Sequence, residues 1–419
     1  MLAGIAKTLE LRMVAMDGTL ALFDSPANLA DFTNFGPSQF VPPATLGGSL
    51  QIAPDRAVTR AEIRREFPQA PGVYGMLDND RRLVYVGMST NLRSRVVSYF
   101  YEPADGLEVK QYRISLASHS LVWEPSGHEL TAQLRELELI RRFAPRFNAK
   151  GRPGRVRVGY IYLTTEEAPR FRIARSAPRG CVYQWGPVTW SKRTTKAVDC
   201  LNLQFQLRDC ASSTPMHYAD QLDLFNDPLR AGCLRGEIAG CLAPCAGGCS
   251  RAAYRRQIDA ARAFLDGQDS HTLPNLARDM QDAAGRQLFE RAARLRDAHQ
   301  NLELLSALTR QARNAAQQRF IYPLAQEQKT VWHVIRDGRM EAAIEEPQAA
   351  NQARAALEIL ERVYEKTARP ETIEAGDFPF LQMIGGYFRR RPEELAKTLA
   401  PQGAIEHCQR LLQSARRPR

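Results

Sequence analysis

Apolar and polar positions between residues 59 and 150 follow a pattern that predicts a small unit of strands and helices. PGVYGML and RRLVYVGM are apolar runs joined by the polar turn DNDR, which predicts a β-hairpin. TRAEIRREFP, STNLRSRVVSYF and HELTAQLRELELIRRFAP repeat apolar residues at helical spacing. We expect Thr59 to cap the first helix, Ser89 to Asn91 to cap the second, and Pro145 to stop the third. VKQYRISLASHSLVWEPS is expected to add a strand.

The rest of the chain changes character several times. Strand-like segments and cysteine-bearing loops give way to amphipathic helices. The strand-like runs TVWHVI and MEAAI follow, with two helices expected around 352–366 and 393–415. The N-terminal part holds a possible hairpin, ELRMVAMDGTLALFD, and a Pro/Gly-bearing linker. We therefore expect an α+β protein in five parts: 1–58 without assignable chemistry, 59–150 as the compact unit, 151–250 cysteine-rich, 251–315 helical, and 316–419 mixed.

Composition and charge narrow the class of protein. The 419 residues carry a net charge of +11, and 44% of them are hydrophobic, as is ordinary for a globular chain. An excess of positive charge favours a polyanionic partner such as nucleic acid, although many basic proteins have only basic surfaces. No apolar run reaches the roughly 20 residues that cross a bilayer, and the N-terminus lacks a signal-peptide pattern. We expect a cytoplasmic protein with reduced thiols and no membrane partner.

Four residues of the compact unit suit phosphodiester hydrolysis. Tyr74 and Tyr85 fall on neighbouring strands of the hairpin, Arg95 on the next helix, and Glu136 on the apolar face of the last helix. A tyrosine can serve as a base, an arginine can bind a charged phosphorane, and a glutamate with waters can hold one divalent cation. Spacing alone leaves the alternative open, because tyrosines are common in sheets and arginines on helix surfaces.

The motifs GVY, YVG, NLRSR and APRFN, with the glutamate helix, resemble the GIY-YIG nuclease family, in particular its UvrC and Cho branch. The resemblance implies that Tyr85 is the general base with Tyr74 in support. It implies that Arg95 binds the scissile phosphate, that Glu136 holds Mg²⁺ or Mn²⁺, and that Asn148 lines the site. One position departs from the family: Met88 follows the glycine where a lysine is usual, which weakens the case for full catalytic strength.

A basic run follows the glutamate helix and predicts a grip on the DNA backbone. RRFAPRFNAKGRPGRVR holds seven basic residues, no acidic one and two interleaved phenylalanines. With one arginine of the preceding helix, the expected DNA-binding residues are Arg93, Arg141, Arg142, Arg146, Lys150, Arg152, Arg155 and Arg157.

Seven of the eight cysteines lie between Cys181 and Cys249. In a reducing compartment such crowding favours a metal centre over disulfides, and thiolates suit zinc or iron–sulfur clusters. The expected ligands are Cys210, Cys233, Cys241 and Cys245, with Cys249 as a possible replacement. CLAPC resembles the CLGPC of the same family, which implies a [4Fe–4S] cluster, with zinc as the alternative. Free thiols in a loop are the remaining interpretation.

The run LFERAARLRD resembles the UVR motif, an αα-hairpin through which family members contact UvrB. Helical spacing by itself predicts only core packing for this segment. By the resemblance, Phe289, Leu288 and Leu295 would bind a UvrB-like partner, with Phe289 as the anchor.

Together these expectations describe a nuclease that makes one incision beside damaged double-stranded DNA. No carboxylate set followed by hairpin-helix glycine motifs, as in the family's second nuclease region, occurs before Arg419. A catalytically weak DNA-binding and UvrB-docking module is the main alternative, favoured by Met88. An RNA-acting or mobile-element nuclease fits the cysteines and the hairpin less well.

Overall fold

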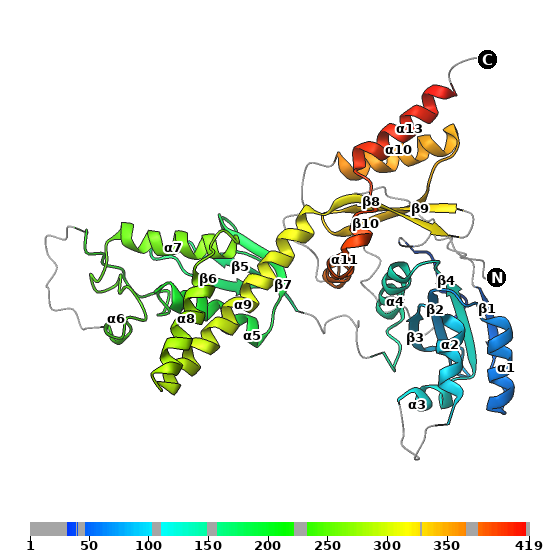
Figure 1. Cartoon of the computed structure of the whole chain (residues 1–419), viewed down its shortest axis with the longest axis horizontal. Coiled ribbons are helices and arrows are strands. Elements are labelled where there is room, and N and C mark those ends of the chain that lie inside the picture. The colour runs from blue at the N-terminus through cyan, green and yellow to red at the C-terminus, as the bar shows by residue number, and fades with distance from the viewer. Residues whose placement is uncertain are drawn as a thin grey trace, which may run out of the picture.

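The structure is a computed structural model, and it describes residues 32–38, 40, 47–102, 110–148, 157–221, 233–326, 329–365 and 376–415. The predicted N-terminal hairpin at 10–24 lies outside these residues. Helices and strands are both present, as the α+β expectation requires. The chain forms two lobes joined by a long helix: the nuclease-like unit and the C-terminal part on one side, and the cysteine-bearing part on the other (Figure 1).

A four-stranded antiparallel sheet organises the first unit, in the order β1-β4-β2-β3. Its strands are β1 (Gly48–Gln51), β2 (Gly72–Leu77), β3 (Leu83–Ser89) and β4 (Ser120–Pro125). The predicted hairpin is confirmed as β2 and β3, with Tyr74 opposite Gly87. Every residue of β2 is buried because β3 and β4 flank it and helices cover both faces. β1 comes from a segment that the sequence pattern assigns to a linker, and it pairs with the outer edge of β4.

Helices cover the two faces of this sheet. One face carries α1 (Arg56–Glu66), α2 (Leu92–Val97), the 3₁₀ helix η1 (Ser98–Phe100) and α3 (Lys110–Leu116). The other face carries α4 (Glu129–Phe143) together with Phe32 and Phe35 of the N-terminal segment. The sheet is therefore buried on both sides.

One local prediction in this unit is corrected, and three are confirmed. Helix α1 is capped by Asp55, whose side chain accepts a hydrogen bond from the Ala57 amide, so Thr59 is an internal, buried residue of the helix. The stretch VKQYRISLASHSLVWEPS adds the expected strand as β4, which is preceded by helix α3. The expected cap of α2 is confirmed, since the Asn91 side chain accepts from the Ser94 amide at 3.1 Å. The end of α4 before Pro145 is also confirmed.

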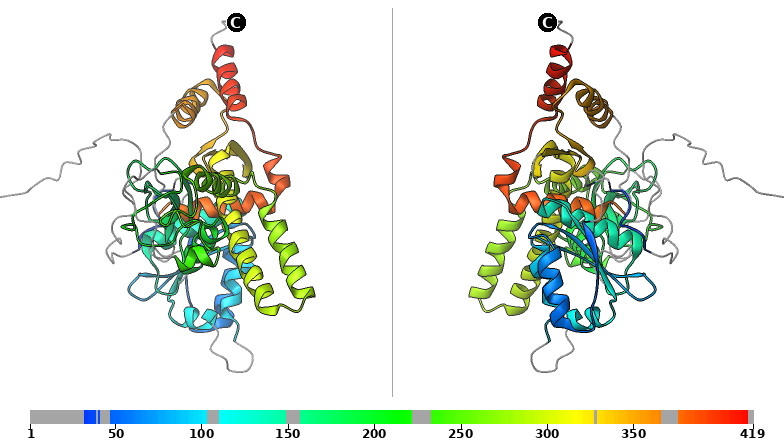
Figure 2. Two further views of the ribbon diagram at one scale, coloured as in Figure 1. Left: turned by 90° about the vertical axis from the view of Figure 1, so that its left-hand side faces the viewer. Right: turned by 90° about the vertical axis from the view of Figure 1, so that its right-hand side faces the viewer.

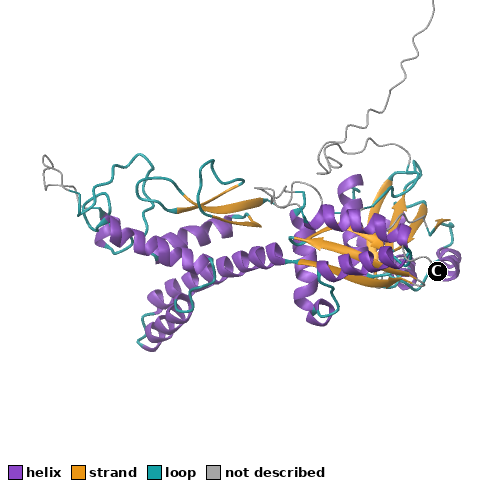
Figure 3. Cartoon of the chain, turned by 90° about the horizontal axis from the view of Figure 1, so that it is seen from above, coloured by secondary structure: helices purple, strands orange, loops and turns teal. Residues whose placement is uncertain are grey.

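The cysteine-bearing lobe packs a three-stranded antiparallel sheet, in the order β6-β5-β7, against helices. Its elements are β5 (Val158–Leu163), β6 (Phe171–Ala174), β7 (Gln184–Thr189), α5 (Lys192–Gln204), α6 (Leu234–Glu237), α7 (Arg251–Leu265), α8 (Thr272–Gly285) and α9 (Phe289–Gln317). Helices α8 and α9 form the expected antiparallel pair, and the turn between them projects from the body of the protein (Figure 2). At 29 residues, α9 is about 43 Å long and reaches the other lobe (Figure 3).

The C-terminal part is a three-stranded antiparallel sheet with helices on both faces. It comprises β8 (Arg319–Gln326), β9 (Lys329–Arg336), β10 (Arg339–Glu345), α10 (Ala350–Tyr364), α11 (Phe378–Arg390), α12 (Pro392–Leu395) and α13 (Pro401–Ser414). β8 and α11 have no counterpart in the sequence expectation. The helix expected around 393–415 is present as α13 but begins only at Pro401. Its expected start forms the separate helix α12, because Leu399 between the two bridges to Ile321 of β8.

Helix α4 belongs to two cores at once. Leu139 and Ile140 pack toward the nuclease sheet. Leu130, Leu134 and Leu137 instead pack with residues of β8, β9, β10 and α11. The α11 helix and the C-terminal sheet therefore lie against the face of α4 that points away from the nuclease sheet (Figure 1). Among the residues described, no helix is long and apolar enough to span a bilayer.

Candidate active site

Three tyrosine rings meet on the α2 side of the nuclease sheet. Tyr74 comes from β2, Tyr85 from β3 and Tyr99 from η1. The ring centroids lie 6.2 Å apart for Tyr74 and Tyr85, 5.9 Å for Tyr74 and Tyr99, and 6.0 Å for Tyr85 and Tyr99. The hydroxyl groups of Tyr74 and Tyr99 are 2.9 Å apart and share a hydrogen bond. Tyr99 is a site residue that sequence reasoning treated only as part of a helical repeat.

Gly87 makes room for this cluster. A Cβ atom at Gly87 would lie 2.5 Å from both Cζ and Oη of Tyr74, which sits opposite on β2. Tyr74 is only 1% exposed, so its ring has no open space to move into. The glycine of the YVG motif therefore lets the Tyr74 ring cross β3.

Two cations border the tyrosines. The Nη2 atom of Arg95 donates to the Tyr99 hydroxyl at 3.3 Å, and its guanidinium lies 5.1 Å from the centre of the Tyr99 ring. The Nζ atom of Lys110 lies 5.8 Å from the centre of the Tyr85 ring. Arg93, in contrast, donates through Nε to the Phe67 carbonyl. A lysine thus stands beside Tyr85 although Met88 occupies the position where a lysine is expected.

Glu136 reaches the site from the opposite face of the sheet. It projects from α4 past the edge strand β3, where the backbone N–H of Met88 donates to its carboxylate. The Met88 side chain packs in the core on the α4 side. In the described part of the chain, Glu136 has no salt bridge within 4 Å, so its carboxylate oxygens have only one fixed partner. A single carboxylate of this kind can hold one divalent cation together with waters, and no group of three or more candidate ligands accompanies it among the described residues.

Burial controls the protonation of the site. It raises the pKa of Glu136 to about 7, although the Met88 N–H and the charge of Arg95 both oppose the rise. Burial, reinforced by the charge of Tyr99, also raises the pKa of Tyr85 above its ordinary value. The charges of Glu136 and Arg95 act on Tyr85 in opposite directions, which places all three groups within electrostatic reach of one another. The site as it stands therefore favours a neutral phenol.

The Asn148 side chain forms hydrogen bonds with the backbone of β3. Its Oδ1 accepts from the Val86 amide at 2.9 Å, and its Nδ2 donates to the Val86 carbonyl at 2.8 Å. The side chain is 6% exposed. Asn148 thus ties the loop after α4 to the strand that carries Tyr85, and both ends of its amide are occupied.

The predicted DNA-binding run is only in part available. Arg141 donates to the Gly376 carbonyl and lies 5.6 Å from the centre of the Phe380 ring, so it joins α4 to the C-terminal part. Arg142 donates to the Pro37 carbonyl at 2.8 Å and stands 3.6 Å from the Glu138 carboxylate. Arg146 and Arg157 are exposed. The remaining members of the run, Lys150, Arg152 and Arg155, lie outside the described residues.

The four predicted cysteine ligands gather at one place. The thiol of Cys241 interacts with those of Cys210, Cys233 and Cys245, and burial is the main cause that raises its pKa to about 11. In the described residues, however, no three cysteine, histidine or acidic side chains stand close enough to hold a metal ion. As placed, the thiols are neighbours without the geometry of a bound ion.

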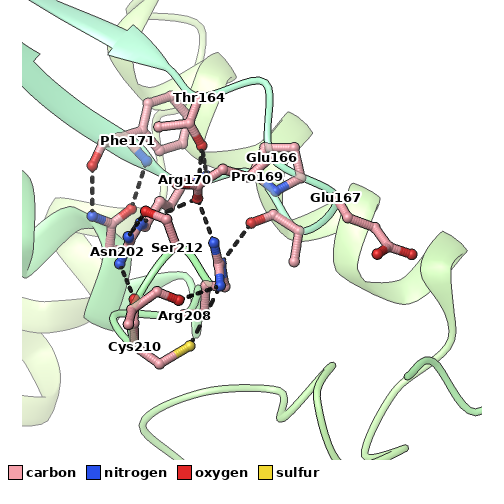
Figure 4. Close-up of polar contacts among 12 residues, drawn as sticks. Thr164, Glu166, Glu167, Pro169, Arg170, Phe171, Asn202, Arg208, Cys210 and Ser212 are labelled. Carbon is pink, nitrogen blue, oxygen red and sulfur yellow. Dashed lines mark hydrogen bonds and ion pairs between the residues drawn. The ribbon is translucent and has the colours of Figure 1, made fainter. Parts of the chain in front are cut away.

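Two arginines hold the Cys210 loop (Figure 4). Arg208 is 2% exposed, and its Nη1 donates to the Cys210 sulfur at 3.5 Å and to the Ala211 carbonyl at 3.1 Å. Arg170 donates to the Cys210 carbonyl at 2.6 Å. Glu166 accepts from Arg208 at 2.5 Å and stands 3.4 Å from Arg170. The first of the four cysteines is thus fixed by a network of paired charges.

The tip of the helical hairpin exposes apolar side chains. Leu288 is 47% exposed and Phe289 is 68% exposed, while Leu295 is half-buried against the core of the lobe. Leu276 and Leu302, farther from the tip, are buried. Two of the three predicted partner-binding residues are therefore accessible.

Each of the two lobes contains a match to a known protein family. Residues 70–149 match the family model described as the UvrC-like GIY-YIG domain, and residues 158–264 match that of the UvrC/Cho excinuclease middle domain. The first match defines the class: the tyrosines, Arg95 and Glu136 lie in a GIY-YIG nuclease domain. With the second match, the chain is similar to the UvrC-like GIY-YIG endonucleases over these two domains.

Curated relatives match the same part of the chain. UvrABC system protein C of Salinispora tropica is 33% identical over 236 residues, which are 55% of this chain and 33% of the relative. The protein of the same name from Renibacterium salmoninarum is 35% identical, over 55% of this chain and 34% of the relative. That of Methanothermobacter thermautotrophicus is 32% identical, over 57% and 38%. The chain spans about a third of the length of these relatives.

Among solved structures, a similar one is the GIY-YIG N-terminal endonuclease domain of UvrC from Thermotoga maritima bound to its catalytic divalent cation, magnesium. It is 25% identical, covers 22% of this chain and 97% of its own, and superposes with a TM-score of 0.19.

Proposed function

We propose that this chain is a metal-dependent DNA endonuclease that makes a single incision in nucleotide excision repair. The observation that carries the proposal is the convergence of Tyr85, Arg95 and Glu136 at the edge strand of the nuclease sheet, within electrostatic reach of one another. The matches to UvrC-like domains and to UvrABC system protein C support the repair context and damaged double-stranded DNA as substrate.

The residues divide the chemistry among them. Arg95, held by Tyr99, binds the phosphate that is attacked and stabilises the charge it gains. Tyr85 orients the attacking water and, in its phenolate form, takes its proton, with Tyr74 and Tyr99 fixing its position. Glu136 is the residue that would hold Mg²⁺ or Mn²⁺, and the cation would supply stabilisation of the leaving oxygen.

Lys110 is the residue we assign to the role of the missing lysine. Burial disfavours the phenolate of Tyr85, and a nearby cation opposes that effect. The Lys110 ammonium stands over the Tyr85 ring, whereas Arg93 is turned to a backbone carbonyl. Lys110→Met should therefore slow nicking and shift its pH dependence upward. Arg93→Met should leave the pH profile unchanged, and equal effects of both changes would contradict the assignment.

The decisive experiment is a nicking assay on a lesion-bearing duplex with Mg²⁺ and a UvrB-type protein. We expect one nick per duplex, lost in Tyr85→Phe and in Glu136→Gln, and retained in Tyr162→Phe, a tyrosine of β5 in the other lobe. Strong binding without cleavage by the unsubstituted chain would contradict an enzyme. That outcome would establish the second candidate, a DNA-binding and UvrB-docking module, which the raised pKa of Tyr85 and the presence of Met88 favour.

The cysteines and the hairpin extend the proposal to a cofactor and a partner. We assign a [4Fe–4S] cluster, or zinc, to Cys210, Cys233, Cys241 and Cys245, because the four thiols gather in one place. Anaerobic absorbance with iron and zinc analysis distinguishes the two metals. Cys241→Ser should release the metal and Cys408→Ser, in the C-terminal core, should not. The exposed hairpin tip is the surface proposed to bind a UvrB-like protein.

A further inference from the structure

Helix α1 carries a row of arginines whose charges are not neutralised by acidic side chains. Arg56, Arg60 and Arg64 follow one another at intervals of four residues, so they share one side of the helix. Among the described residues none of the three forms a salt bridge, although Arg65 on another side of the same helix pairs with Glu66. Like charges at this spacing destabilise an isolated helix, so the row must be held by contacts outside the helix.

Tyrosines and neutral oxygens hold these arginines in place. Arg56 lies 4.5 Å from the centre of the Tyr112 ring and donates to the Ser115 hydroxyl at 3.3 Å. Arg60 lies 5.1 Å from the centre of the Tyr101 ring. Arg64 donates to the Tyr101 hydroxyl at 2.8 Å. Such partners fix the side chains and leave their charge available, which is the arrangement that preorganises binding of an anion.

The arginine row connects directly to the proposed active site. Arg60 also donates to the carbonyl of Phe100, at 2.9 Å. Phe100 separates Tyr99, which points inward to Tyr74 and Arg95, from Tyr101, which is 51% exposed. Helices α1, α2 and α3 cover the same face of the sheet as the three tyrosines, and α1 contacts α2 (Figure 1).

We propose that the α1 arginine row, Arg56, Arg60 and Arg64 with Tyr101 and Tyr112, binds the phosphate backbone of duplex DNA beside the scissile site. The inference rests on the proposed nuclease function. It assigns DNA-backbone binding to α1 in addition to the exposed arginines of the basic run. Arg141 of the expected basic run joins α4 to the C-terminal part, and Arg142 stands beside the Glu138 carboxylate. The α1 row, in contrast, has no acidic partner among the described residues. Arginines four residues apart lie about 6 Å apart along the helix, so the row can follow the closely spaced charges of a phosphate backbone.

The test compares the full chain with an Arg56→Gln/Arg60→Gln/Arg64→Gln variant, using a lesion-bearing duplex in EDTA so that no strand is cut. We expect the dissociation constant to rise about tenfold or more. The slope of log affinity against log salt should fall by about 2–3, because each phosphate contact contributes roughly 0.9. Arg65→Gln is the matched control on the same helix and should change the slope little. Tyr101→Leu, which removes the support of two arginines, should give an intermediate loss.

Hydrogen exchange keeps the proposal testable if the triple variant folds poorly. In the unsubstituted chain, adding the duplex should slow exchange in 56–65 and 98–101. An unchanged salt slope, or equal losses in the triple variant and in Arg65→Gln, would overturn the α1 assignment. Nicking by the unsubstituted chain would in that case leave the proposed function standing. Failure of the unsubstituted chain to bind the duplex at all would overturn both.

Discussion

At the scale of single residues, Glu136 illustrates how function and stability compete. In the proposed function its carboxyl group must be ionised to hold a cation, yet burial raises its pKa to about 7. The folded state therefore retains a proton that the unfolded chain releases near pH 4.5. The ionised carboxylate of the metal-free protein consequently costs stability, and the cost grows as pH rises from about 4.5 to about 7.

Glu136→Gln should remove this cost. We expect the metal-free variant to equal the parent in stability near pH 4.5 and to exceed it at pH 8, by on the order of 1–3 kcal/mol. Denaturant unfolding at the two pH values measures the difference. In the parent, Mg²⁺ affinity should rise with pH through about 7, and the variant should show no Mg²⁺-dependent stabilisation. A variant less stable than the parent at pH 8 would contradict the assigned burial of the charge.

Gly87→Ala tests the close approach of Tyr74 to β3. The added Cβ would meet the Tyr74 ring at 2.5 Å, and the buried ring has no free space. We expect a loss of about 1–3 kcal/mol in unfolding free energy and a weakened contact between Tyr74 and Tyr99. Gly403→Ala in α13, where nothing lies within 4 Å, is the control and should be neutral or slightly stabilising. Equal effects of the two changes would show that crowding at β3 is not the cause.

At the scale of elements, α4 packs against both the nuclease sheet and the C-terminal part, and so joins the two halves of its lobe. Its Glu136 faces the tyrosines, while Leu130, Leu134 and Leu137 face α11 and the C-terminal sheet. Arg135, which is 1% exposed, donates to Glu124 of β4 at 3.0 Å and to Glu138 at 2.6 Å. It also donates to the Gly36 carbonyl and so binds the N-terminal segment. The orientation of Glu136 is therefore set by packing from several directions.

Removing apolar volume from α11 should loosen α4. Ile384 is 0% exposed and lies in the core shared with α4. Ile384→Ala should lower the free energy of unfolding by about 2–5 kcal/mol and speed hydrogen exchange in 130–137. Leu360→Ala makes a similar cavity on the opposite face of the C-terminal sheet, in the core with α10 and α13. That control should leave exchange in α4 slow. Equal acceleration by both changes would contradict a specific contact between α11 and α4.

At the scale of the whole molecule, α9 joins the lobes while its beginning forms the exposed hairpin tip. The buried end of the helix pair belongs to the core of the cysteine-bearing lobe, through Leu302 and Leu305. The other end leaves Phe289 to solvent. A partner bound at the tip would therefore be held away from the nuclease lobe by a continuous helix (Figure 3).

Phe289→Ala should abolish or strongly weaken binding of a UvrB-type protein without lowering the melting temperature, because its side chain is 68% exposed. Phe264→Ala in α7, at 3% exposure, is the matched change in the core and should cost about 3–5 kcal/mol. Calorimetric titration and thermal unfolding on the same preparations measure both effects. Unchanged affinity in a folded Phe289→Ala protein would assign the partner to another surface.

What the sequence determined by itself is local. The hairpin, the cap at Asn91, the end of α4 at Pro145 and the placement of Tyr85, Arg95 and Glu136 on their elements follow from periodicity and turn chemistry, which act over a few residues. Resemblance between short motifs supplied their expected roles. The domain class followed because these motifs cluster within one compact segment.

What only the tertiary structure decided concerns residues far apart in the chain. Lys110 stands beside Tyr85, and the hydroxyl groups of Tyr99 and Tyr74 share a hydrogen bond. Arg141 forms a hydrogen bond with the C-terminal part. Strand β1 was missed because pairing with β4 depends on a partner about seventy residues away. Charge on a sequence does not say which arginines find partners after folding, since that depends on packing. For the same reason the basic run looked like the DNA grip, and the unneutralised row on α1 became apparent only in the folded protein.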